Sequence, residues 1–148
     1  MFDKIFQALT DDKAVRMLLI DSSIVKVHQH ASGAQKKTED EGIGRSHGGL
    51  SSKIHCSVNE QGCPLSIYLT GGQVHDSQYG EVLLSGKQGD FVIGDKAYAI
   101  SKLLKEKESM ASVGVIPPHP RGKLARCKDR VLYKRRKVIE RFINKLKH

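Results

Sequence analysis

Residues 133–148, YKRRKVIERFINKLKH, have the spacing of one amphipathic helix. Successive residues of an α-helix turn by about 100°, so the apolar side chains of this region gather on one arc that we expect to pack on a core: Val131, Val138, Ile139, Phe142 and Leu146. A second, narrower arc collects Tyr133, Arg136, Glu140 and Lys147. The segment therefore predicts a helix with one buried side and one polar side of unusual composition.

Glu140 is the only acid of that helix, among seven basic residues: Lys134, Arg135, Arg136, Lys137, Arg141, Lys145 and Lys147. Two explanations are open. Glu140 can form an i,i+4 ion pair with Arg136, which contributes a few tenths of a kcal/mol. Alternatively, Glu140 holds a metal cation while the basic side chains bind the phosphates of a nucleic acid. The helix taken alone favours the ion pair.

The composition of the chain favours a polyanionic partner. The 148 residues carry a formal net charge of +9, and 39% of them are apolar with no Trp. Nucleic acid is the first partner that such a balance suggests. No run of 18 apolar residues predicts a membrane span, and the acidic start MFDKIFQALTDD does not resemble a signal peptide. We therefore expect a cytoplasmic, nucleoid-associated protein without a membrane partner.

The remaining chain predicts an α/β order. Apolar and β-branched runs indicate strands, and amphipathic spacing indicates helices. Strands are expected at 16–28, 50–58, 64–70, 91–94 and 112–116, helices at 2–15, 75–84 and 100–109, and polar or basic loops at 29–49 and 119–128. Asp76 or Ser77 is expected to cap the helix at 75–84, and capping is the favoured role of Asp76. Arg45, in the Gly-rich end of the first loop, is a candidate phosphate contact or simply part of a polar loop.

Two of the apolar strands each supply an aspartate. Asp21 interrupts the run that begins at Met17, and Asp95 follows the strand at 91–94. An isolated Asp21 could turn outward at a bulge, or it could be buried with a partner, because an unpaired buried carboxylate is costly. If the two strands are parallel neighbours, both aspartates reach one crevice at the edge of the sheet, where open α/β sheets usually bind ligands. A helix packed on that sheet could bring Glu140 beside them.

Three converging carboxylates repel one another unless cations relieve the repulsion. Oxygen-rich sites suit Mg²⁺ or Mn²⁺. A pair of such ions about 4 Å apart stabilises both the attacking and the leaving oxygen of a phosphoryl displacement. The three acids therefore predict a site for two metal ions, and the basic surface predicts a polynucleotide substrate. Zinc is not expected, because no spacing of Cys and His fits a usual zinc site.

These residues carry a family resemblance. Tyr133, Arg136, Glu140 and Lys147 form the pattern Tyr-x2-Arg-x3-Glu-x6-Lys, which resembles the signature around the catalytic glutamate of bacterial insertion-sequence DDE transposases. Upstream segments resemble further motifs of that family in the expected order: IDSSIV at 20–25 with HQHA at 28–31, GRS-x-GGL at 44–50 with K-x-H at 53–55, LTGGQVHD at 69–76, GDK-x-Y at 94–98 and VIPP at 115–118. The resemblance covers residues 16–148.

The resemblance implies an RNase H-like α/β fold, with a mixed five-stranded sheet flanked by helices in a single catalytic domain. It implies that Asp21, Asp95 and Glu140 bind two Mg²⁺ or Mn²⁺ ions, and that a metal-activated water cleaves DNA before the freed 3′-hydroxyl attacks a target. Residues expected at the DNA backbone are Tyr133, Arg136, Lys147, Arg45 and Lys96. The partners implied are double-stranded DNA and a second copy of the chain.

The chain departs from the family pattern in ways that leave other hypotheses open. It is expected to be truncated at both ends relative to the family, so a companion polypeptide could supply the N-terminal region. Ala97 and Ala99 stand where the family tends to have Gly and Asp, and Asn59 stands where Asp is frequent. The alternative to the enzyme is a catalytically silent DNA-binding remnant of a transposase. A nuclease without strand transfer would use the same three acids.

Overall fold

The computed structural model describes residues 15–28, 42–98, 112–117 and 129–147. Residues 2–14 of the helix predicted at 2–15, the helix predicted at 100–109, the basic segment 119–128, residues 29–41 of the predicted loop and the Ala99 departure lie outside the described residues. The described elements, in chain order, are β1 (Met17–Lys26), β2 (Gly44–Ser46), β3 (Gly49–Val58), β4 (Pro64–Gly71), α2 (Asp76–Leu84), β5 (Phe91–Ile93), the short 3₁₀ helix η2 (Lys96–Tyr98), β6 (Val113–Val115), α4 (Arg130–Lys134) and α5 (Lys137–Lys147).

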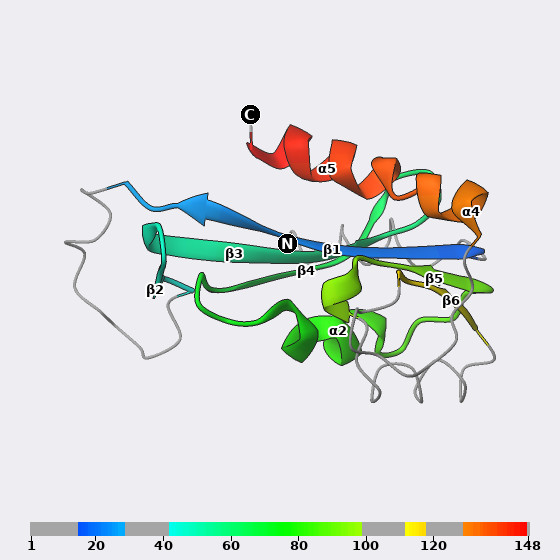
Figure 1. The fold of residues 1–148 in the computed structure, drawn as a ribbon, viewed down its shortest axis with the longest axis horizontal. Coiled ribbons are helices and arrows are strands. Elements are labelled where there is room, and N and C mark those ends of the chain that lie inside the picture. Colours follow the sequence, from blue (N-terminus) through cyan, green and yellow to red (C-terminus); the bar gives the residue numbers. More distant parts are fainter. Residues whose placement is uncertain (1–14, 29–41, 99–111, 118–128, 148) are drawn as a thin grey trace, which may run out of the picture.

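All described strands join one mixed sheet with the order β2-β3-β1-β5-β6, and β4 also pairs with β3, along Ser52–Val58 (Figure 1). β3 runs antiparallel to β1, β2 and β4, whereas β5 is parallel to both β1 and β6. The five predicted strands are therefore present, and the parallel pairing of the first and fourth is confirmed. The sixth strand, β2, corrects the prediction of a loop through residues 44–46. This segment has no apolar pattern of its own and is held by its hairpin pairing with β3.

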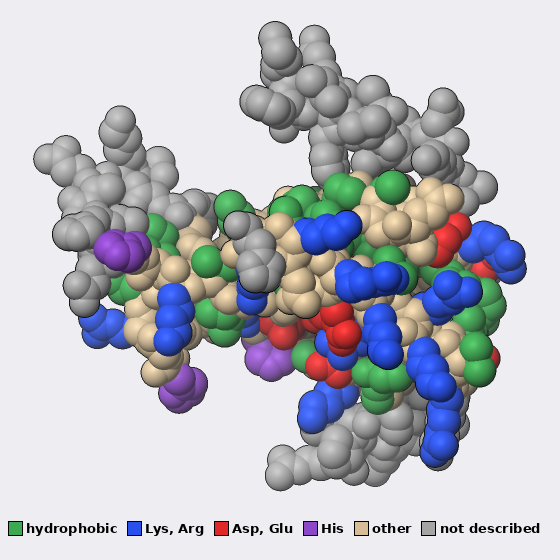
Figure 2. Space-filling model, turned by 90° about the horizontal axis from the view of Figure 1, so that it is seen from above, with side chains coloured by type: hydrophobic (Ala, Val, Ile, Leu, Met, Phe, Trp, Pro, Cys, Tyr) green, Lys and Arg blue, Asp and Glu red, His purple; other side chains and the backbone are tan. Residues whose placement is uncertain are grey.

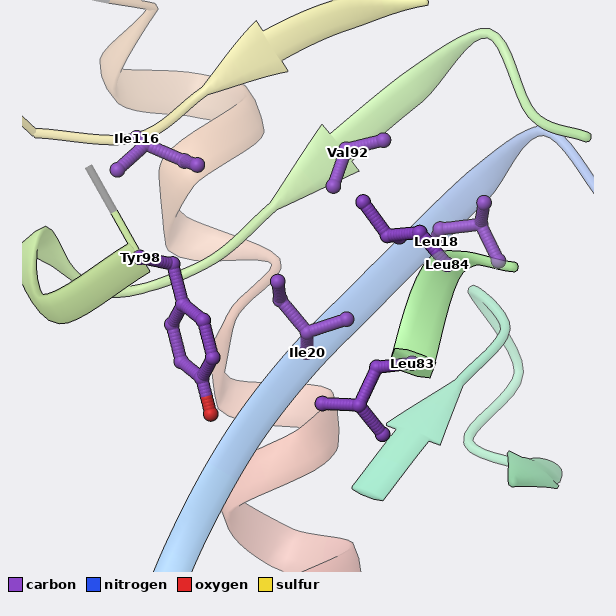
Figure 3. Close-up of a cluster of buried hydrophobic side chains, with 7 residues drawn as sticks. All are labelled: Leu18, Ile20, Leu83, Leu84, Val92, Tyr98 and Ile116. Atoms are coloured by element: carbon purple, nitrogen blue, oxygen red, sulfur yellow. The ribbon is translucent and has the colours of Figure 1, made fainter. Parts of the chain in front are cut away.

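Helices cover both faces of the sheet, with α2 on one side and α4 and α5 on the other (Figure 1). Because successive side chains of a strand point to opposite faces, β1 supplies both layers. Leu18 and Ile20 pack with Leu83 and Leu84 of α2, in the cluster that Figure 3 shows with Tyr98 and Val92. The opposite face forms a second cluster with α5: Leu19, Cys56, Val58, Ile93, Val115, Ile139 and Ile143.

The C-terminal region is not the single helix that its spacing predicts. Asp129 caps α4 by accepting hydrogen bonds from the backbone of Val131 and Leu132, and a turn at residues 135–136 separates α4 from α5. The expected core residues Val131 and Leu146 are exposed, at 74% and 45%, whereas Ile139 and Ile143 are the buried residues of α5.

Candidate active site

Asp21 lies on the α5 side of β1, two residues beyond Leu19, and is only 8% exposed. Its position opposite Cys56 in the β1–β3 ladder holds it within regular strand structure. The backbone N–H of Ser22 donates to Asp21 Oδ1 at 2.9 Å, and Nη2 of Arg136 donates to Oδ2 at 3.0 Å. Of the two alternatives left by the sequence, the outward turn is therefore wrong, and the buried, paired aspartate is present.

Asp95 comes near Asp21 through the parallel pairing of β5 with β1. Leu19 pairs with Ile93, and continuing that register by two residues places Asp95 level with Asp21. Gly94 lets the backbone after β5 pass close to the side chain of Ile20 in β1, because a Cβ at position 94 would lie 3.0 Å from Cγ1 of Ile20. The Asp95 carboxylate accepts the backbone N–H of Lys96 at 2.6 Å. Its carbonyl accepts the N–H of Tyr98 at 3.0 Å, and the buried Tyr98 ring anchors this turn in the core.

Arg136, in the turn before α5, brings the three acids together. Besides its bond to Asp21, its Nη2 lies 4.0 Å from Oδ2 of Asp95. Its Nη1 lies 3.1 Å from Oε1 of Glu140, one helical turn later. The i,i+4 pair that the helix alone favoured is thus present, but it is one of three contacts. Asp21, Asp95 and Glu140 converge on a single guanidinium group.

Burial and charge shift the ionisation of this cluster. Burial raises the pKa of Asp21 above its ordinary value and Asp95 adds to that rise, although Arg136 and the Ser22 N–H oppose both effects. Burial alone would lower the pKa of Arg136, but the carboxylates of Asp21 and Asp95 outweigh it and raise the pKa. One guanidinium thus carries a single positive charge within 4.0 Å of three carboxylates.

The donor chemistry of the cluster fits a hard divalent cation, because all of its ligands would be carboxylate oxygens. As they stand in the described part of the chain, however, no three acidic, His or Cys side chains are grouped closely enough to hold a metal ion. Each of the three carboxylates instead lies near Arg136, at 3.0 Å for Asp21, 4.0 Å for Asp95 and 3.1 Å for Glu140.

The other predicted site residues are distributed around this cluster. Tyr133 is half-buried against the α5-side core, whereas Lys96, Lys147 and Arg45 are exposed. Further exposed basic side chains of α4, the turn and α5 are Lys134, Arg135, Lys137, Arg141 and Lys145. Figure 2 shows Lys and Arg side chains beside a small acidic group on the face viewed from the α5 side. Arg45 lies farther away, on β2, in a pocket that it shares with His47 and Gln73.

A second polar cluster, on the α2 face of the sheet, was not predicted. Lys53 Nζ donates to Asp76 Oδ1 at 2.8 Å and to the carbonyl of Val74 at 2.6 Å. The capping role expected for Asp76 is therefore wrong, because His75 caps α2 instead. Burial opposes the ionisation of Asp76, but the bonds from Lys53 and from the hydroxyl of Ser22 outweigh it and lower its pKa.

His55 completes this second cluster. Its ring is fully buried and stacks on Tyr79 with centroids 4.4 Å apart, and its Nε2 lies 2.9 Å from the hydroxyl oxygen of Thr70. Burial lowers the pKa of His55 to about 4. The sequence carried one usable signal for this cluster. The spacing Lys53-x-His55 in a strand places both residues on one face, with Ser22 opposite His55 in the neighbouring strand.

Comparison with known proteins assigns the family. Residues 15–148 match the protein family described as the transposase DDE domain. The chain belongs to the DDE transposase family. Over 100 residues it is 36% identical to a protein named as a transposase for insertion sequence element IS6501, from Brucella ovis. That alignment covers 66% of this chain and 77% of the relative.

The fold of this DDE transposase family member agrees with the resemblance, since a mixed sheet flanked by helices, in the order described above, is RNase H-like. A solved structure of the Mos1 strand transfer complex aligns with a TM-score of 0.42 and 10% identity. The alignment covers 79% of this chain but only 38% of that one. Among the described residues, no helix is both long and apolar enough to cross a membrane.

Proposed function

We propose that this chain is the catalytic domain of an insertion-sequence transposase, which cleaves DNA strands at the ends of the element and joins them to target DNA. The observation that supports the proposal is the convergence of Asp21, Asp95 and Glu140 on one guanidinium from three separate elements. Those elements are the middle of β1, the turn after β5 and α5. A structural ion pair needs one acid for one base, and the additional carboxylates are what a cation site requires.

Under this proposal, Asp21, Asp95 and Glu140 hold two divalent cations, Mg²⁺ or Mn²⁺. Such ions, when bound, activate water and stabilise the charge that develops on the oxygens of a phosphate undergoing displacement. The protein residues have the task of positioning. The strand ladder fixes Asp21, the Lys96 N–H and the Tyr98 anchor fix Asp95, and packing of Ile139 and Ile143 fixes the helix that carries Glu140.

We further propose that the exposed basic residues bind the DNA backbone. Lys134, Arg135, Lys137, Arg141 and Lys147 are exposed on α4, α5 and the turn between them, the region that also supplies Arg136 and Glu140, so they can hold phosphates beside the reacting one. Lys96 is adjacent to Asp95 and fits the same role, and Arg45 would contact a more distant stretch of DNA. Tyr133 and Arg136 would act nearest the cut. Pairing of two DNA ends by two copies of the chain, a companion N-terminal polypeptide and association with the nucleoid belong to this proposal.

The decisive experiment is nicking of supercoiled plasmid in the presence of Mn²⁺, comparing the wild type with Glu140→Gln. The expected result is nicking that is lost in the variant and in EDTA. Arg135→Gln is a matched control for DNA affinity, because it removes one exposed charge from the same region without touching the three acids. Nicking that persists in Glu140→Gln at the wild-type rate would refute the proposed site.

One observation favours a second candidate, the catalytically silent DNA-binding remnant. Arg136 already occupies the space among the carboxylates, and a chain that only coats DNA would need no other cation there. The remnant predicts salt-sensitive DNA binding that is equal in wild type and Glu140→Gln, with no nicking by either. It also predicts no binding of Mn²⁺ at the three acids, which separates it from an enzyme that lacks only its DNA-recognition region.

A further inference from the structure

We propose that Arg136 and divalent cations compete for the same three carboxylates, so that metal binding releases the guanidinium to a phosphate of the DNA backbone. The inference rests on the proposed function, because it assigns Asp21, Asp95 and Glu140 to metal binding. It adds a role for Arg136 that a simple DNA contact does not have. In the metal-free protein Arg136 is the internal counter-ion of the site, and in the loaded protein it becomes a ligand for the substrate.

The competition follows from the contacts of one side chain. Nη2 of Arg136 lies 3.0 Å from Asp21 and 4.0 Å from Asp95, and Nη1 lies 3.1 Å from Glu140. A cation shared by these three acids must lie between them, where the guanidinium now lies. The two cannot occupy this space together, and both are cations, so each also repels the other.

The local structure allows Arg136 to leave. It belongs to the turn between α4 and α5 rather than to a regular helix, and a change in its side-chain direction leaves the backbone hydrogen bonds of both helices in place. Its side chain is 22% exposed and therefore has a path to solvent. Its Nε is buried without a hydrogen-bond partner in the described part of the chain, so the present arrangement leaves one donor unsatisfied. The charge pairs, rather than full hydrogen bonding, keep the side chain in place.

A phosphate is the natural second partner for the released group. A guanidinium presents paired N–H donors whose geometry matches the oxygens of a carboxylate or a phosphate equally well. The residues on either side, Arg135 and Lys137, are exposed and basic. A DNA backbone held by these neighbours would lie within reach of Arg136 as it turns away from the acids. Metal loading and substrate binding would thereby strengthen one another.

The first test measures Mn²⁺ binding to the full chain without DNA, from the electron paramagnetic resonance signal of the free ion. Arg136→Gln removes the competitor, and we expect it to bind Mn²⁺ roughly tenfold more tightly than the wild type. Arg135→Gln removes the same charge one residue away, outside the cluster, and is expected to change the affinity by less than about twofold. Equal affinity in wild type and Arg136→Gln would overturn the exchange.

The second test uses the wild type as well as the variant, so it does not depend on the variant folding. The affinity for a short DNA duplex is measured against salt concentration, with and without Mn²⁺. One additional phosphate contact should steepen the salt dependence of the wild type by about one unit of slope when Mn²⁺ is present. Arg136→Gln should show no such change, and Arg135→Gln should keep it. An unchanged wild-type slope would contradict the release of Arg136 to DNA.

The outcomes separate this inference from the proposed function. If Asp21→Asn binds Mn²⁺ as the wild type does, the acids are not the metal site and the proposed function fails. If Mn²⁺ binding depends on Asp21 but Arg136→Gln does not tighten it, the metal site stands and the exchange is wrong. Thermal melting of each variant establishes that it is folded before either comparison is made.

Discussion

The buried imidazole of His55 should make the protein sensitive to mild acid. The ring lies against Tyr79 and the hydroxyl of Thr70, with no exposed surface. Burial, reinforced by the charge of Lys53 and opposed by that of Asp76, lowers its pKa from 6.5 to about 4. The folded state therefore resists a proton that the unfolded chain accepts readily.

The sign and size of the effect follow from linkage. Between pH 6.5 and pH 4 the unfolded state binds more protons at this position than the folded state, so the free energy of unfolding falls as the pH falls. The shift from 6.5 to about 4 corresponds to a loss of about 2 kcal/mol by pH 5 and about 3 kcal/mol by pH 4. The contribution is fully present above pH 6.5, where both states hold a neutral ring.

Urea unfolding at a series of pH values from 7.5 to 4.5 measures this loss, in roughly half-unit steps near the expected transition. The comparison that isolates His55 is the wild type against His55→Gln, which cannot take up the proton. His47→Gln, at an exposed position, is the matched control. The wild type should lose about 2 kcal/mol more than His55→Gln on going from pH 7 to pH 5. Parallel stability curves for the two proteins, or a nuclear magnetic resonance titration of His55 near pH 6.5, would refute the reasoning.

Further substitutions test the contacts on the two faces of the sheet. Lys53→Met should cost about 1–3 kcal/mol of unfolding free energy, because it removes the cation that pairs with the half-buried carboxylate of Asp76. Adding Asp76→Asn should restore part of that loss, and a single-variant cost under about 1 kcal/mol in urea unfolding would contradict the pairing. Ile139→Ala should cost about 2–4 kcal/mol by opening a cavity under α5, whereas Val131→Ala at the 74% exposed position should cost less than about 0.5 kcal/mol. If Ile139→Ala and Val131→Ala had similar melting temperatures, the burial of Ile139 between α5 and the sheet would be contradicted.

The sequence predicted the strands that carry the acids because local and tertiary preferences agree there. The runs that end near Asp21 and Asp95 are apolar on both faces, as expected of central parallel strands. A buried carboxylate in such a run needs a partner, and Arg136 is that partner. The hairpin between β3 and β4 was predictable for a similar reason, since Gly62 takes a φ of 85° that its loop requires.

The features that the sequence did not predict depend on contacts between distant segments. Nothing in YKRRK opposes a continuous helix, because neither Gly nor Pro is present. The turn at residues 135–136 coincides with the reach of Arg136 to Asp21, 115 residues away. Asp76 likewise has the sequence context of a helix cap, and only the folded sheet brings Lys53 to it. Local propensity gives no information about such partners.

The position of Asp21 also has a consequence for how β1 finds its alignment. Leu18, Leu19 and Ile20 are all completely buried, so a slip by one residue would exchange one aliphatic side chain for another and cost little in burial. The next two residues are not interchangeable, because Asp21 must face Arg136 while Ser22 must face Asp76. Asp21 and Ser22 therefore fix the register of β1, which its aliphatic residues alone would leave ambiguous. In the double variant Asp21→Ser with Ser22→Asp, no single register of β1 should keep both its aliphatic contacts and its polar contacts.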